Sequence, residues 1–206
     1  SLAAIENGWF RDEIVPVTVF GRGGDTEVDT DEQPGNAKPE KIPHLKPAFA
    51  KDGSVTAANS SSISDGASAL VLASAAEADA RGLVPQARIV AHATHARLPA
   101  EFTLAPIGSI EKVLKKAGWS VDDVDLFEIN EAFAVVTLAA MNELKLPADK
   151  VNVHGGACAL GHPIGSSGSR IIVTLINALK QRGLKRGVAS LCIGGGEGTA
   201  VAIELI

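Results

Sequence analysis

The chain has 206 residues, of which 46% are apolar and 21% are charged, so it can bury a core and most of it is expected to fold. Its 19 basic and 24 acidic side chains give a formal net charge of −5, which argues against a nucleic acid or an anionic membrane as partner. The first residues do not form a signal peptide, and no run of about 18 apolar residues predicts a membrane span.

The two cysteines, Cys158 and Cys192, are too few for a disulfide framework. No Cys-x-x-Cys pair or His/Cys cluster accompanies them, so a metal site has no support. This use of cysteine fits a reducing compartment, and we expect a cytoplasmic protein.

Residues 1–63 differ in pattern from the rest of the chain. They begin with a short helix over 1–8 and a strand over 13–20, which ends at a glycine-rich turn over 21–24. Acids, lysines and prolines then follow one another without periodicity from residue 25 to residue 47. This composition predicts an extended surface arm or lid.

From residue 65 onward, predicted strands alternate with predicted helices. Such alternation is typical of an α/β fold in which a mixed sheet is covered by helices on both faces, here with a final antiparallel hairpin. The expected strands are 67–72, 87–93, 125–129, 151–153, 187–193 and 199–206, and the expected helices are 73–81, 108–117, 131–144 and 166–181.

Three polar side chains stand at the ends of predicted strands. Asn130 follows the strand over 125–129, so its amide would either cap the next helix or hold a water for a ligand. His162 lies in a glycine-rich loop over 155–168, where it would act as a general base or oxyanion donor unless its role is structural. That loop has neither a phosphate-binding nor a dinucleotide-binding pattern. Cys192 would move protons or act as a nucleophile if a positive partner is close, and would be inert if it is buried.

The three side chains are separated by 32 and 30 residues, and side chains at strand ends converge in open α/β sheets. Over its whole length the sequence resembles the thiolase family, the acetyl-CoA acetyltransferases. The resemblance is carried by Asn130-Glu131-Ala132-Phe133, Gly161-His162-Pro163 and Cys192-Ile193-Gly194-Gly195-Gly196. It implies the layered αβαβα architecture of that family, of which this chain would be roughly the second, C-terminal half.

The resemblance also implies a mechanism. In this family a nucleophilic cysteine takes an acyl group from acyl-CoA, and it lies in an N-terminal half that this chain is expected to lack. His162 would activate that thiol and, with a water held by Asn130, would stabilise the thioester oxyanion. Cys192 would move the alpha proton of acetyl-CoA, while the Gly194 backbone N–H would donate to a second oxyanion. The implied reaction is reversible Claisen condensation or thiolysis of 3-ketoacyl-CoA, with the CoA thioester as substrate and no cofactor.

Family members place further residues around the substrate, and the matching positions here are Phe49, Ser61, Ala132, Phe133 and Phe102. For Phe49, simple packing under a proline-rich loop is the alternative. Phe102 stands where some short-chain enzymes have Met, which leaves the acyl length open. His154 stands where relatives often have Asn, so it adds a titratable group near the site.

By the same resemblance, residues 1–63 are the tail of a loop domain that covers the active site. Residues 64–84 would complete the N-terminal domain with one strand and one helix, and residues 85–206 would form the C-terminal domain. The strand over 67–72 would lack sheet neighbours, so we expect association with a separate N-terminal half. A homodimer or homotetramer is the expected assembly.

Two alternatives remain beside the thiolase interpretation. A ketoacyl-carrier-protein synthase on the same fold is disfavoured, because those enzymes pair the nucleophile with two His or with His and Asn, whereas Cys192 supplies a second thiol. A catalytically incomplete CoA-binding or assembly module is supported by the absent nucleophile. We expect the 206 residues alone to be inactive.

Overall fold

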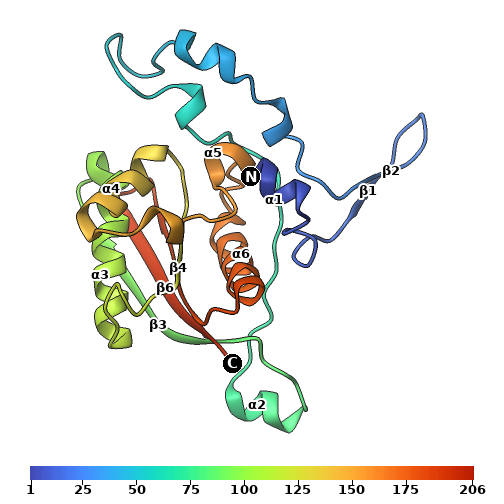
Figure 1. Ribbon diagram of the computed structural model, residues 1–206, viewed down its shortest axis with the longest axis vertical. Coiled ribbons are helices and arrows are strands. Elements are labelled where there is room, and N and C mark those ends of the chain that lie inside the picture. Colours follow the sequence, from blue (N-terminus) through green and yellow to red (C-terminus); the bar gives the residue numbers. More distant parts are fainter.

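The computed structural model describes residues 1–206, with a sheet body below and an arm above it (Figure 1). The sheet consists of β3 (Ala87–Ala96), β6 (Glu197–Leu205), β5 (Arg186–Cys192) and β4 (Leu126–Ile129), in that spatial order. Strand β6 pairs antiparallel with both β3 and β5, whereas β4 and β5 are parallel. The expected mixed sheet and its final β5–β6 hairpin are therefore confirmed.

Helices cover both faces of this sheet, as the sequence predicted. Helices α3 (Ala105–Ala117) and α4 (Ala134–Leu144) lie on one face, and α6 (Ser167–Arg182) lies on the other (Figure 1). Strand β4 shows the reason, because successive side chains point to opposite faces of a strand. Phe127 and Ile129 are buried in the cluster that includes α3 and α4, whereas Leu126 is buried against α6.

Two of the helices end at the predicted glycines. Gly118 closes α3 with φ 71°, and Gly183 closes α6 with φ 64°. This left-handed conformation is costly for residues with a Cβ atom, which is why glycine is common at helix ends. Helix α4 begins three residues later than expected, with Phe133 as its N-cap. The capping role considered for Asn130 is therefore wrong.

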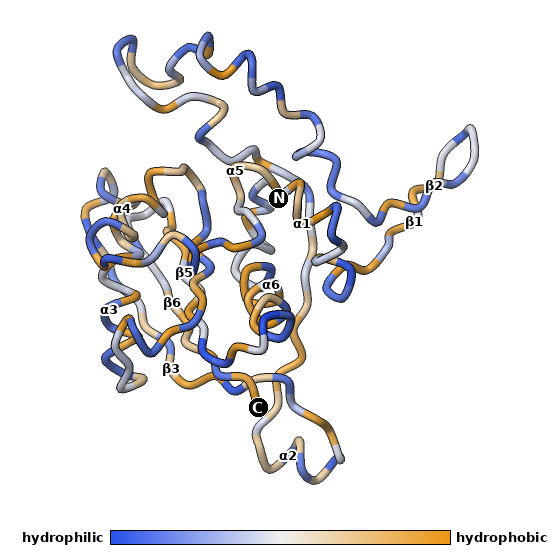
Figure 2. The backbone as a smooth tube through the Cα atoms, in the orientation of Figure 1, coloured by the Kyte–Doolittle hydropathy of each residue, from blue (hydrophilic) through white to orange (hydrophobic).

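The N-terminal third forms the arm and a projecting hairpin. It begins with α1 (Leu2–Glu6). The hairpin is the antiparallel pair β1 (Val17–Val19) and β2 (Thr26–Val28). The arm follows and contains three short 3-10 helices, which are η1 (Pro34–Asn36), η2 (Pro39–His44) and η3 (Ala57–Asn59) (Figure 1). The strand expected over 13–20 is shorter because Glu13 turns toward α6, where its carboxylate accepts hydrogen bonds from Thr174 and Asn177. Hydrophilic residues predominate on the arm (Figure 2).

Two expected strands are absent. Residues 67–72 run extended but pair with no neighbour, and Val71 is 94% exposed. A strand requires a partner for its backbone N–H and C=O groups, which is lacking here. The expected helix follows as α2 (Ala75–Ala80), capped by the Ser74 side chain. In the range 151–153, only Val151 forms a bridge, to Phe127 of β4.

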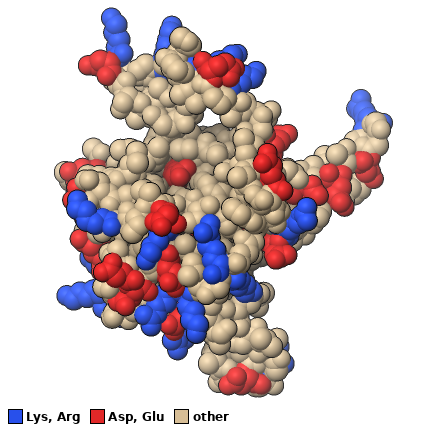
Figure 3. All heavy atoms as spheres, in the orientation of Figure 1, with Lys and Arg blue, Asp and Glu red and all other residues tan.

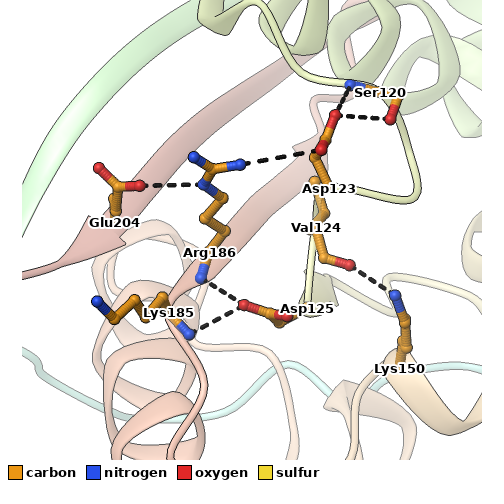
Figure 4. A network of polar contacts seen from close by, with 8 residues as sticks. All are labelled: Ser120, Asp123, Val124, Asp125, Lys150, Lys185, Arg186 and Glu204. Carbon is orange, nitrogen blue, oxygen red and sulfur yellow. Dashed lines mark hydrogen bonds and ion pairs between the residues drawn. The ribbon is translucent and has the colours of Figure 1, made fainter.

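Charged side chains tie the starts of β4 and β5 together (Figure 4). The Asp125 carboxylate accepts hydrogen bonds from the backbone N–H groups of Lys185 and Arg186, at 2.9 and 2.8 Å. The Arg186 guanidinium contacts Glu204 of β6 at 3.0 Å and lies over the Trp119 ring. These contacts fix the end of the two parallel strands that lies opposite the polar residues Asn130 and Cys192.

No helix of the chain is both long and apolar enough to cross a membrane.

Candidate functional site

Asn130 and Cys192 lie at the same end of the sheet, where the parallel strands β4 and β5 finish. Ile129, the last residue of β4, pairs in parallel with Ser190 of β5, and the Asn130 backbone N–H donates to the Ser190 carbonyl at 2.9 Å. Cys192 ends β5 two residues later. The carboxyl ends of parallel strands are where open α/β sheets bind ligands, so this edge is the candidate site.

The Asn130 side chain faces His162. It is 1% exposed, and its Nδ2 lies 3.3 Å from the His162 Nε2. Its Oδ1 is buried without a hydrogen-bond partner. This oxygen is available to accept a hydrogen bond from a water or a ligand donor.

His162 is held on both sides of its ring and by its backbone. It lies in the loop between α5 (Ala157–Leu160) and α6, and its N–H donates to the Ser62 carbonyl at 2.9 Å. Its Nδ1 lies 2.5 Å from the Ser167 hydroxyl. Burial, and then the charge of Arg170, lower the pKa of His162 below its usual value of 6.5. The ring is therefore neutral near pH 7 and can accept a proton.

Cys192 has a buried thiol and is the last residue of β5, just before the turn to β6. It is 6% exposed, and burial raises the pKa of the thiol to about 11. The exposed residue Gly194 follows in the turn between β5 and β6. The thiol is therefore protonated at rest, which fits a proton donor or the inert buried thiol that the sequence left open, and does not fit a nucleophile.

The residues proposed to surround the substrate come together. Phe133 makes edge-to-face contacts with Phe49 of the arm and with Phe102 of η4 (Pro99–Leu104), at centroid separations of 6.0 and 6.2 Å. Ser61 donates to the Ala132 carbonyl from both its backbone N–H and its hydroxyl, at 3.1 and 2.9 Å. The arm is thus anchored to the loop that follows Asn130. Figure 3 shows a hollow between the arm and the sheet body, with an acidic group at its floor.

Two residues beside the site were missed by the sequence analysis. The Glu131 carboxylate accepts hydrogen bonds from the Asn152 side chain at 2.9 Å and from the Cys158 backbone N–H at 3.1 Å. It connects the loop after β4 with the loop before α5. Glu131 stands within the Asn130 motif, but no feature of the sequence reveals its contact with Asn152. The structure gives Asn152 a φ of 47°, which is rare outside glycine.

Cys158 is part of this connection, because its Sγ lies 3.8 Å from the carbonyl oxygen of Glu131, and His154 lies in the loop before α5. The His154 ring stands between Trp9 and Phe10, at centroid distances of 5.1 and 5.7 Å. Burial, and then Arg182, lower its pKa to about 4. Burial and the neighbouring Glu131 raise the pKa of the Cys158 thiol to about 12. No group of three or more His, Cys, Asp or Glu side chains is arranged to hold a metal ion.

Two family models match the chain. One described as "Thiolase, C-terminal domain" matches residues 83–205, and one described as "Thiolase, N-terminal domain" matches residues 1–76. The description of the chain as the C-terminal half is therefore corrected, because sequence of both domains is present. The finer division at residues 63 and 84 stays a prediction.

Known proteins of similar sequence have one recurrent name. The acetyl-CoA acetyltransferase of Syntrophomonas wolfei is 50% identical over 205 residues, which are 98% of this chain and 52% of that protein. The cytosolic acetyl-CoA acetyltransferase of Mus musculus is 51% identical over 200 residues, 96% of this chain and 50% of that protein. The chain thus spans about half the length of these relatives.

A solved structure of similar fold is the Bacillus anthracis acetyl-CoA acetyltransferase. It superposes with a TM-score of 0.96 at 50% sequence identity, over 100% of this chain and 52% of that one. The expected layered α/β architecture is confirmed by this match. The match also extends over the arm and the hairpin, so the placement of these segments is shared with that protein.

Proposed function

The chain belongs to the thiolase family, and from that premise we propose that it acts in an acetyl-CoA C-acyltransferase, which forms or cleaves 3-ketoacyl-CoA. The observation that carries the proposal is the contact of Asn130 with His162, at 3.3 Å, beside the strand that ends in Cys192. The unpartnered Asn130 Oδ1 supports a bound water at this place. The names of the relatives support acetyl-CoA as substrate.

For the acyl-transfer step, we propose that neutral His162 accepts the proton of a thiol as the sulfur attacks the thioester carbonyl. A bond from that sulfur to the carbonyl carbon forms, the bond from that carbon to the CoA sulfur breaks, and CoA leaves as a thiol with the proton that His162 returns. The protonated His162 and a water held by Asn130 would donate to the oxyanion that develops. Cys158, whose pKa is raised to about 12, does not suit the attacking thiol. We therefore assign that thiol to a chain segment outside these 206 residues.

For the carbon–carbon step, we propose that Cys192 exchanges a proton with the alpha carbon. A thiol with a pKa of about 11 holds its proton at rest and can donate it to the carbanion formed in thiolysis. In synthesis the thiolate would take the alpha proton. The N–H of Gly194, in the exposed turn that follows, would donate to the second oxyanion.

We propose that the aromatic group of Phe49, Phe102 and Phe133 forms an apolar wall for the pantetheine and acyl parts of the substrate, with Ser61 and Ala132 beside it. Their contacts with one another support a shared role. The proposed chemistry uses the CoA thioester and no cofactor. We keep a homodimer or homotetramer and a cytoplasmic location as proposals, the latter supported by the cytosolic mouse relative.

The acid/base role of Cys192 is tested by Cys192→Ser in the assembled enzyme, which is this chain together with the segment that carries the attacking thiol. A positioned acid/base contributes about 100-fold to 10,000-fold in rate, so Cys192→Ser should lower both thiolysis and synthesis by a factor in this range. Exchange of acetyl-CoA methyl protons with deuterated water should stop as well. The control is Cys158→Ser, which should change rates less than about threefold. Unchanged exchange in Cys192→Ser would exclude the acid/base role.

A second candidate is a CoA-binding or assembly module without catalysis of its own. It is favoured by the raised pKa of both thiols, about 11 and about 12, because neither is an activated nucleophile. Calorimetric titration of the 206-residue chain with CoA tests the module, because absence of binding would contradict it, and an acetoacetyl-CoA cleavage assay tests the assignment of the attacking thiol. Binding without cleavage is expected for these residues alone, whereas cleavage would contradict the assignment of the attacking thiol to another segment.

A further inference from the structure

One serine of α6 lies against the side of the His162 ring that faces away from Asn130. The Ser167 hydroxyl is 2.5 Å from Nδ1, while Nε2 is 3.3 Å from the Asn130 Nδ2. Ser167 is fully buried, at 0% exposure. Water therefore does not compete for the contact between the hydroxyl and the ring.

The hydrogen bonds of Ser167 bear on which ring nitrogen of His162 carries the proton. A hydroxyl has one proton to donate, and a neutral imidazole has one N–H and one lone pair. Ser167 donates to the carbonyl of Pro163 at 3.1 Å, so its oxygen offers a lone pair to Nδ1. With the hydroxyl proton directed at Pro163, Nδ1 is the N–H, and Nε2 keeps the lone pair toward which the Asn130 amide N–H₂ is directed.

We propose that Ser167 is a positioning residue that holds His162 in the Nδ1–H tautomer, so that Nε2 beside Asn130 is the atom that accepts protons. The hydrogen bond at one ring nitrogen sets the protonation of the other. This inference rests on the proposed function, in which His162 takes the proton of the attacking thiol. It adds a residue that selects the reactive atom of the base.

Neighbouring serines do not share this contact. Ser166 and Ser169 both lie 2.6 Å from the Ser68 hydroxyl, on the side of α6 that faces the extended segment. Ser169 also donates to the Ser166 carbonyl at 3.0 Å. Ser169 is therefore a matched control, because it is a hydroxyl in the same helical turn with no contact to His162.

The test is two-bond ¹H–¹⁵N correlation spectroscopy of the histidine rings in the 206-residue chain, at a pH where His162 is neutral. His162→Gln identifies the His162 signals among the 5 histidines. We expect the Nδ1–H pattern in the wild type and in Ser169→Ala. In Ser167→Ala the pattern should change to a mixture of tautomers or to Nε2–H. Ser167→Thr, which keeps the hydroxyl, should restore the wild-type pattern.

Two results would overturn the inference: an Nε2–H ring in the wild type, or an unchanged ring in Ser167→Ala. If Ser167→Ala does not fold, the wild-type and Ser167→Thr spectra still decide which nitrogen is protonated. In the assembled enzyme we expect Ser167→Ala to lower kcat about tenfold and to leave KM within about twofold, as for loss of one orienting hydrogen bond. An active enzyme with an Nε2–H ring would contradict only the role of Ser167. An inactive assembled enzyme with an Nδ1–H ring would contradict only the proposed function.

Discussion

Asn152 occupies both backbone hydrogen-bonding groups of Ile129. Its Oδ1 accepts from the Ile129 N–H at 2.8 Å, and its Nδ2 donates to the Ile129 carbonyl at 2.9 Å. A side-chain amide thus replaces a neighbouring strand at the end of β4. Asn130 is the next residue, so Asn152 fixes the position from which the Asn130 side chain reaches His162.

Removing the Asn152 amide should therefore destabilise the site. Asn152→Ala leaves the Ile129 N–H unpaired and removes one of the two hydrogen bonds to the Ile129 carbonyl, which keeps the bond from the Thr137 hydroxyl at 3.3 Å. We expect the free energy of unfolding to fall by about 2 kcal/mol. Urea unfolding measures the change, and Asn142→Ala on the exposed surface of α4 is the control, expected within about 0.5 kcal/mol of wild type. A loss no larger than that of the control would show that Asn152 does not hold the strand end.

Gly156 leaves room for the Glu131 carboxylate. A Cβ atom at this position would overlap the carboxyl group of Glu131. We expect Gly156→Ala to lower the free energy of unfolding by about 1 to 3 kcal/mol, as in other overpacked sites. In α6, Gly168 has open space around the same position, so Gly168→Ala should be neutral or should stabilise by about 0.5 kcal/mol. Equal effects of the two substitutions in thermal unfolding would contradict the steric explanation.

Glu128 of β4 should make stability depend on pH. It is 2% exposed, its Oε1 has no hydrogen-bond partner, and burial raises its pKa to about 8 against the opposing charge of Arg170. The unfolded chain loses this proton near pH 4.5, whereas the folded chain keeps it up to about pH 8. Stability is therefore expected to fall as pH rises through this window, by up to about 1.4 kcal/mol per pH unit.

The variant Glu128→Gln stays neutral and should lack this loss. When the free energy of unfolding is measured between about pH 5 and about pH 8, the stability of Glu128→Gln relative to the wild type should increase with each rise in pH. Glu143→Gln, an exposed substitution on α4, should follow the wild-type curve. Parallel curves for the wild type and Glu128→Gln would mean that Glu128 ionises in the folded chain as it does in the unfolded one.

His154 should produce the opposite pH dependence. Burial, and then Arg182, lower its pKa from 6.5 to about 4. Between these values the unfolded chain binds a proton that the folded chain excludes, so stability is lost as pH falls from about 6.5 to about 4. His154→Phe keeps a ring between Trp9 and Phe10 and should flatten the profile. Trp9 fluorescence in a Trp119→Phe background reports the change, and an equally steep profile in His154→Phe would contradict it.

Much of the sheet body could be predicted from the sequence. A short apolar run predicts a buried strand such as Leu126–Ile129. Gly118 and Gly183 indicate helix ends, because glycine tolerates the left-handed backbone conformation found there. The placement of Asn130 and Cys192 at one edge followed from the same elements, because parallel strands end on the same side of a sheet. These features depend on neighbours in the chain, so local sequence carries them.

The unpaired segment 67–72 and the late start of α4 could not be predicted in this way. A run of β-branched and apolar residues has the propensity for a strand, but a strand forms only where another backbone completes its hydrogen bonds. The late start of α4 depends on the Ser61 contacts with Ala132, which hold the preceding loop against the arm.

The sequence by itself determined the residue types of the site: an amide and a thiol at the ends of two strands, and an imidazole in the glycine-rich loop before α6. Only the tertiary structure decided which atoms meet, since the Ser167 hydroxyl at Nδ1 and the unpaired Asn130 Oδ1 depend on the packing of α6 and the loop after β4. Hydrogen bonds require a separation near 3 Å and a defined direction. Residue spacing along the chain does not specify such geometry, because it arises when segments distant in sequence are fixed against one another.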